Sequence, residues 1–114
     1  MKYVRLKKRA EFGQVFKRGR TYGDRYLVLF VLYPGRGPSP RVGFATQRTA
    51  GTAVKRNRIR RRLRALYSLY AESVGDCGDL IFLGKKTILD ASWSDLQQSM
   101  KRVLRQSGCL GGKG

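Results

Sequence analysis

The sequence predicts an α+β domain, a two-layer sandwich with a small central sheet and elements in the order α-β-β-α-β-α. Short apolar and aromatic runs bounded by Gly and Pro indicate strands, and longer segments with apolar residues at helical spacing indicate helices. A chain of 114 residues, of which 41% are hydrophobic, fits one domain with a core that needs no disulfides. We therefore expect residues 1–114 to form a single domain.

The first half of the chain is expected to supply one helix and two strands. Residues 1–6 are expected as an extended arm, and residues 7–18 as a helix ended by Gly19. Residues 26–33, YLVLFVLY, predict a strand whose two faces are both covered, unless one face is a binding surface. After a Gly- and Pro-containing loop, residues 41–46 predict a second strand that forms a hairpin with the first.

The second half is expected to supply two helices around a third strand. Thr52 is placed to cap a helix running to about Tyr70, with a buried stripe of Ile59, Leu63, Leu66 and Tyr70. Residues 79–83, apolar on both faces, predict the third strand. Ser92 and Asp95 have capping-box spacing at the start of a last helix, whose apolar stripe is Trp93, Leu96, Met100, Val103 and Leu104. The glycines of residues 108–114 predict a flexible tail.

Charge is the dominant feature of the composition. The chain has 25 Lys and Arg against 7 Asp and Glu, a net charge of +18. Such a charge destabilises a compact fold by self-repulsion, so a polyanionic partner is expected, with nucleic acid first and an anionic membrane surface second. The longest apolar run, residues 26–33, is far short of the ~20 residues that span a bilayer, and no targeting segment follows the basic N-terminus.

The sharpest motif is the run AVKRNRIRRRLR at residues 53–64. On a helix, Asn57, Arg60, Arg61 and Arg64 fall within about a third of a turn, away from the apolar stripe. A solvated face usually mixes charges of both signs, whereas this one has no acid and places cations in the first turn, against the helix dipole. Because bound phosphates would relieve both conflicts, a nucleic-acid contact is favoured over a merely solvated face. The candidate RNA-binding residues are Lys55, Arg56, Asn57, Arg58, Arg60, Arg61, Arg62 and Arg64.

Other side chains offer little chemistry of their own. Phe12 and Phe16 share a helix face and, with Phe30, could stack on unpaired bases, although the pattern alone favours an ordinary core. The chain has no His and its few acids are scattered, so we expect neither a catalytic residue nor a metal site. Cys77 and Cys109 are interpreted as free thiols of a cytoplasmic protein.

Several blocks occur in the order found in a known family. Residues 53–64 resemble the "RNR" helix of the bacterial ribonuclease P protein, and residues 5–8 with 12–19 resemble that family's opening segment. The strands at 41–45 and 79–81 are also similar, so the resemblance covers roughly residues 5–107. It implies a fold like that of the second domain of ribosomal protein S5, with a left-handed βαβ crossover through the arginine-rich helix.

The resemblance also implies a function. A catalytic RNA subunit, which holds Mg²⁺, would cleave the 5′ leader from precursor tRNA. This chain would bind that RNA through the helix and hold the leader in a cleft formed by Phe12, Phe16, Phe30 and Lys17. Neither a membrane nor another protein would be required. The alternatives are a ribosomal or other structural RNA-binding protein, and a membrane-active cationic protein.

Overall fold

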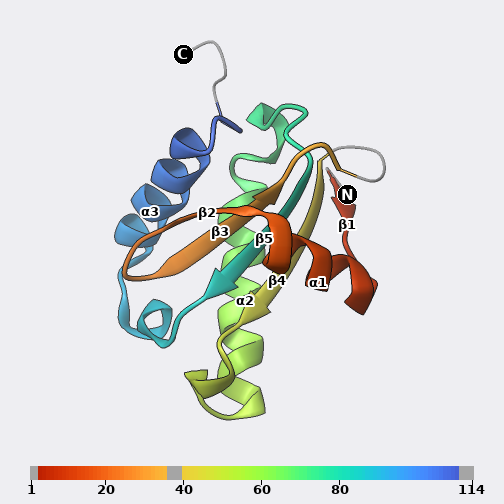
Figure 1. Ribbon diagram of the computed structural model, residues 1–114. Helices are drawn as coiled ribbons and strands as arrows, with labels where there is room; N and C mark the ends of the chain where they lie inside the picture. Colours follow the sequence, from red (N-terminus) through yellow and green to blue (C-terminus); the bar gives the residue numbers. More distant parts are fainter. Residues whose placement is uncertain (1–2, 36–39, 111–114) are drawn as a thin grey trace.

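A computed structural model describes residues 3–35 and 40–110, and it contains one five-stranded sheet with the order β1-β4-β5-β3-β2 (Figure 1). The β1, β4 and β5 strands are parallel neighbours, whereas β3 is antiparallel to both β5 and β2. The strands are β1 (Val4–Arg5), β2 (Arg20–Gly23), β3 (Leu27–Leu32), β4 (Arg41–Thr46) and β5 (Asp79–Gly84).

The predicted hairpin of residues 26–33 with 41–46 is wrong. The β5 strand lies between β3 and β4, antiparallel to the first and parallel to the second. The β5 strand is buried along nearly its whole length, so it takes the central position, where both backbone edges find partners. The β3 and β4 strands, which follow each other in the sequence, are therefore separated in the sheet by β5, which comes later in the chain.

Two edge strands were not predicted as strands. Val4 and Arg5, within the expected arm, pair in parallel with the start of β4. Residues 20–23 pair with β3, and most of their side chains are exposed. A short, polar edge strand has no alternating apolar pattern, because only its backbone is required by the sheet.

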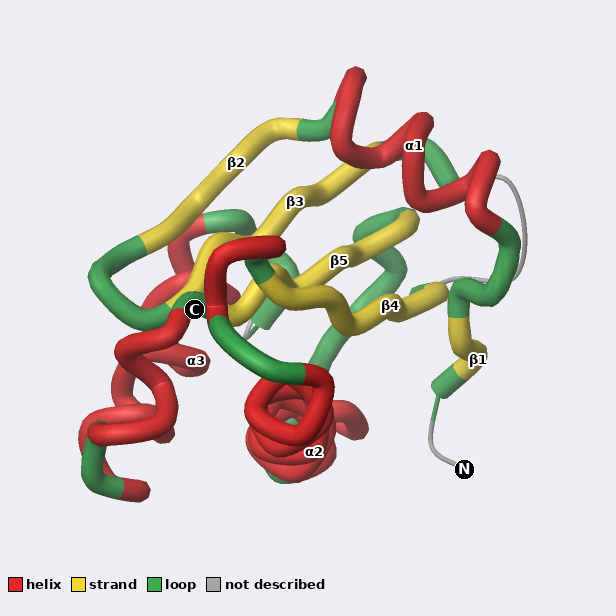
Figure 2. The backbone as a smooth tube through the Cα atoms, turned by 90° about the horizontal axis from the view of Figure 1, so that it is seen from below, coloured by secondary structure: helices red, strands yellow, loops and turns green. Residues whose placement is uncertain are grey.

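Helices cover both faces of the sheet, unequally (Figure 2). The α2 helix (Ala53–Ser68) and the α3 helix (Trp93–Gln106) enclose the main core on one face, and α1 (Arg9–Arg18) covers part of the other. Under α1 lies a smaller core of Leu6, Val15 and Ile81. The α+β class and the sheet-and-helix sandwich are confirmed, with α1 added outside the two expected layers.

Both helix caps lie where the sequence predicts them, whereas two residues predicted for the buried stripes, Tyr70 and Trp93, do not belong to them. Thr52 Oγ1 accepts a hydrogen bond from the Lys55 amide at 3.3 Å, and Ser92 Oγ accepts one from the Asp95 amide at 3.1 Å. The α2 helix ends at Ser68, so Tyr67 rather than Tyr70 completes its buried stripe. Trp93 is 43% exposed and lies outside the α3 stripe.

The α2 helix sits close against β5, and this contact fixes which of its faces is free. A Cβ added at Gly84 would lie 2.3 Å from Ile59 Cγ2, so only glycine permits this approach. Tyr67 packs beside Phe82 with ring centroids 5.3 Å apart. Because these contacts hold the apolar stripe against the sheet, the arginine-rich side faces away from it.

Three 3₁₀ turns and the segment of residues 108–110 complete the described part of the fold. The turns are Arg48–Ala50, Ala71–Ser73 and Lys86–Asp90. Residues 108–110 do not form a free tail, because Leu110 bridges to Val74 and the Gly75 amide donates to the Cys109 carbonyl at 3.1 Å. The remaining expected tail, residues 111–114, lies outside the described residues. Within residues 3–35 and 40–110, no helix is long and apolar enough to cross a bilayer.

Candidate nucleic-acid interface

The α2 helix presents most of its cations away from its buried stripe. Ile59, Leu63 and Leu66 are fully buried, and none of the predicted binding residues is. Four of these residues are exposed, namely Lys55, Asn57, Arg58 and Arg61. The other four are half-buried, namely Arg56, Arg60, Arg62 and Arg64. The first turns of α2 extend beyond the end of the sheet (Figure 1), which leaves them accessible to a large partner.

None of these cations is neutralised by an acid in the part of the chain that the structure describes. The ion pairs found there are Arg41 with Glu11, Arg41 with Asp79, and Arg102 with Asp24. All three lie off α2, so the protein neutralises other arginines and leaves the α2 face positive. That arrangement fits a partner that brings its own negative charges.

Two of the predicted binding residues also act within the protein. Arg62 donates a hydrogen bond to the Ile88 carbonyl at 3.0 Å and so ties α2 to the turn at Lys86–Asp90. The Asn57 side-chain oxygen accepts a hydrogen bond from Arg60, which orients that guanidinium. The sequence pattern could not reveal the Arg62 contact, because Ile88 is distant along the chain.

The charge of Arg41 is neutralised by two carboxylates within the protein. Its Nε and one terminal nitrogen donate to the two Asp79 oxygens at 3.0 and 2.9 Å, and the other terminal nitrogen donates to Glu11 at 2.7 Å. These bonds, that to Asp79 foremost, raise the pKa of Arg41 above its ordinary value, and the bond from Arg41 lowers the pKa of Glu11. The cluster attaches α1 to the start of β4 and β5.

The predicted aromatic residues do come together, with different roles. The Phe16 and Phe30 rings meet edge to face with centroids 4.8 Å apart, and Phe12 lies 6.4 Å from Phe16. Phe12 packs over Gly43, where an added Cβ would lie 2.5 Å from its ring, so this residue belongs mainly to the packing. Phe16 is 38% exposed, and the neighbouring Lys17 is exposed.

A half-buried apolar strip continues this aromatic cluster along the sheet. Val28, Leu83 and Ala45 are paired neighbours across three strands, on the face that α1 covers only in part. Thr46, next to Ala45, ends β4, and the chain then leads into α2. The apolar strip and the cationic first turns of α2 are thus joined by a short segment of chain.

The described residues include seven acids and no histidine. They contain no group of three or more His, Cys, Asp or Glu side chains that could hold a metal ion. The most buried carboxylate, Asp79, is bound to Arg41 on both oxygens.

Fold and surface together define a class: small basic α+β proteins whose βαβ crossover helix carries an arginine face. A family model described as Ribonuclease P matches residues 1–108. The chain is 41% identical over 107 residues to the ribonuclease P protein component of Chloroflexus aggregans, covering 93% of this chain and 78% of that one. It is 31% identical to the component of Geobacillus kaustophilus, covering 96% and 90%.

A solved structure shows the same fold. The ribonuclease P protein of Staphylococcus aureus superposes with a TM-score of 0.78 at 24% identity, covering 97% of this chain and 94% of that one. The chain belongs to the ribonuclease P protein family. It is thereby a protein component of the endoribonuclease complex that processes tRNA 5′ ends, and a partner of ribonuclease P RNA.

Proposed function

We propose that the chain binds the catalytic RNA of ribonuclease P through the α2 arginines and holds the 5′ leader of precursor tRNA on its aromatic surface. The observation that carries the proposal is the α2 face, where seven Lys and Arg residues between 55 and 64 meet no acid among the residues that the structure describes. Forked guanidinium groups suit bidentate contacts to phosphate. Neutralising phosphates on both RNAs would let them approach each other.

Leader contact is assigned to Phe16 and Phe30, with Phe12 beside Phe16. Their edge-to-face cluster leaves Phe16 partly exposed, next to the apolar strip of Val28 and Leu83. Stacking on aromatic rings tolerates any base, which suits leaders of varied sequence. Lys17 would add a phosphate contact from the same helix.

Phosphodiester cleavage is assigned to the RNA subunit, together with the Mg²⁺ that activates and stabilises the reacting oxygens. Three of the seven acids, Glu11, Asp24 and Asp79, do not fit a magnesium site, since they already bind Arg and Ser side chains. This chain contributes binding and orientation. Cys77 and Cys109 are free thiols that hydrogen-bond to each other, and their reduced state supports the proposal of a cytoplasmic location.

The test is reconstitution with ribonuclease P RNA and a labelled precursor tRNA at low Mg²⁺, beside RNA-alone and protein-alone controls. Cleavage at the leader junction should require both components. Replacing Arg60, Arg61 and Arg64 by Ala should lower the salt slope of RNA binding by roughly 0.7–0.9 for each phosphate that the variant no longer binds. An unchanged slope would contradict the assignment of the α2 face to RNA binding.

Lys101→Gln serves as a control for net charge, because Lys101 is exposed on α3, away from α2 and the aromatic cluster. It should leave cleavage and the salt slope nearly unchanged. Preferential capture of ribosomal RNA, with no stimulation of cleavage, would instead support a structural RNA-binding role.

A further inference from the structure

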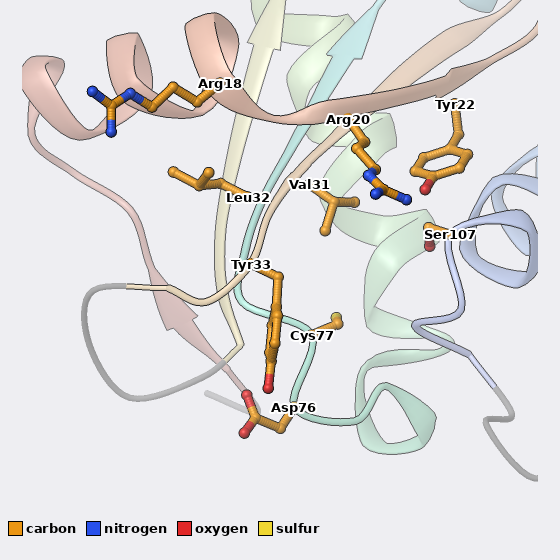
Figure 3. A pocket seen from close by; sticks show the side chains of 9 residues that line it. All are labelled: Arg18, Arg20, Tyr22, Val31, Leu32, Tyr33, Asp76, Cys77 and Ser107. Carbon is orange, nitrogen blue, oxygen red and sulfur yellow. The ribbon is translucent and has the colours of Figure 1, made fainter.

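A cleft that includes no residue of α2 or of the aromatic cluster has its own set of polar and aromatic groups. It lies where the end of α1, β2, the end of β3, the segment before β5 and the end of α3 meet, and its volume is about 450 Å³ (Figure 3). Small-molecule sites usually measure about 300–1,000 Å³. The cleft contains none of the residues assigned above to RNA or leader binding.

One end of the cleft carries an unneutralised cation. Arg20 extends into it from β2, toward Tyr22, whereas the Arg18 guanidinium extends away along α1 and leaves that residue at the rim (Figure 3). Arg20 is exposed, and in the described part of the chain it belongs to none of the ion pairs. A guanidinium in this position is suited to hold one phosphate group.

The opposite end carries a carboxylate and an open aromatic ring. Tyr33 extends toward Asp76 (Figure 3) and is 64% exposed, the second most exposed of the large hydrophobic side chains described. Asp76 is exposed and pairs with no cation among the described residues. A ring face can stack on a base, and a carboxylate accepts hydrogen bonds from ribose hydroxyls or base amino groups.

The order of these groups discriminates between ligands. A bare anion would gain from Arg20 and be repelled by Asp76, whereas a ligand with a phosphate at one end and donors at the other complements both. From this geometry we propose that the cleft binds one nucleoside 5′-monophosphate unit, with its phosphate at Arg20 and its base against Tyr33. The unit is either a free nucleotide or a nucleotide within an RNA strand.

The experiment follows backbone amide shifts in ¹⁵N-labelled full-length protein at about 0.15 M salt, where exposed charges are largely screened. The probes are uridine 5′-monophosphate, uridine, inorganic phosphate and a pentauridylate RNA. We expect saturable shifts at Arg20, Val31, Leu32, Asp76 and Ser107 with the nucleotide, and much weaker binding of uridine and of phosphate. If pentauridylate shifts the same amides, the source is an RNA strand; if only the mononucleotide does, it is a free nucleotide.

Two variants test the assigned contacts. Arg20→Gln should raise the Kd of the nucleotide about tenfold by removing a charge-assisted contact, and Tyr33→Ser should raise it about fivefold by removing the stacking surface. Both side chains are exposed, so circular dichroism should confirm unchanged folding. Lys101→Gln, with the same loss of charge outside the cleft, should leave the Kd unchanged.

Phosphate binding as tightly as the nucleotide would overturn the proposal, and so would nucleotide shifts confined to α1 and α2. Equal losses of affinity in Arg20→Gln and Lys101→Gln would do the same, because they would indicate a general charge effect. None of these measurements uses ribonuclease P RNA, so their failure is distinguishable from failure of the reconstitution.

Discussion

The cluster of Arg41, Glu11 and Asp79 allows a quantitative test of how the fold tolerates its charge. Arg41→Met removes the only cation bound to Asp79 in the described structure, and Asp79 is 2% exposed. Breaking a buried ion pair by deleting one partner costs about 3–5 kcal/mol, because the other charge stays buried without compensation. For a domain of this size, that loss corresponds to a decrease in Tm of about 12–20 °C.

The double variant Arg41→Met/Asp79→Leu separates the pair from its surroundings. Replacing both partners with apolar groups leaves no uncompensated buried charge, so the double variant should be more stable than Arg41→Met by about 2 kcal/mol or more. Urea unfolding of the wild type, both single variants and the double variant completes the cycle. The salt slope of RNA binding by Arg41→Met should equal that of the wild type, since Arg41 contacts protein carboxylates.

Two results would refute this reasoning. A loss below about 1 kcal/mol in Arg41→Met would mean that Asp79 is solvated or protonated without its partner. A double variant less stable than both single variants would mean that packing, and not charge compensation, dominates at this position.

Three further perturbations test other contacts. Gly43→Ala places a Cβ 2.5 Å from the Phe12 ring and should lower the free energy of unfolding in urea by about 1–3 kcal/mol. Gly13→Ala, whose Cβ meets nothing within 4 Å, is the control and should be neutral or stabilising. Equal effects of the two substitutions would contradict the packing role of Phe12. Arg62→Gln should lower thermal stability with little change in the salt slope, and Arg61→Gln should do the reverse; identical behaviour would remove the distinction between them. Burial alone would raise the pKa of Asp24, but hydrogen bonds from Ser99 and the Tyr26 and Leu27 amides, with the Arg102 charge, lower it. Because the folded pKa lies below the unfolded value of about 3.9, this stability is present above that pH and is lost as the pH falls through the folded pKa. Asp24→Asn should flatten the acid limb of a stability–pH profile measured by urea unfolding, and Glu72→Gln, at an exposed position, should not; parallel profiles for wild type and Asp24→Asn would contradict the assignment.

The sequence by itself determined the features that depend on neighbours along the chain. The caps at Thr52 and Ser92 follow from residue type and spacing along the chain. The stripe of Ile59, Leu63 and Leu66 and the arginine side of α2 follow from helical periodicity. The need for a polyanionic partner follows from net charge alone. The strong apolar runs were correctly predicted as strands for the same reason, since their composition is a local property.

Only the tertiary structure decided which segments meet. The placement of β5 between β3 and β4, the pairing of β1 and β2, and the packing of Phe12 over Gly43 depend on contacts between distant segments. The fates of individual charges also depend on such contacts: Arg41 meets Asp79 across 38 residues, and Arg62 meets Ile88 across 26. Residue type sets what a side chain can bind, but its partner is chosen by strand order and register, which are satisfied only when the whole sheet forms.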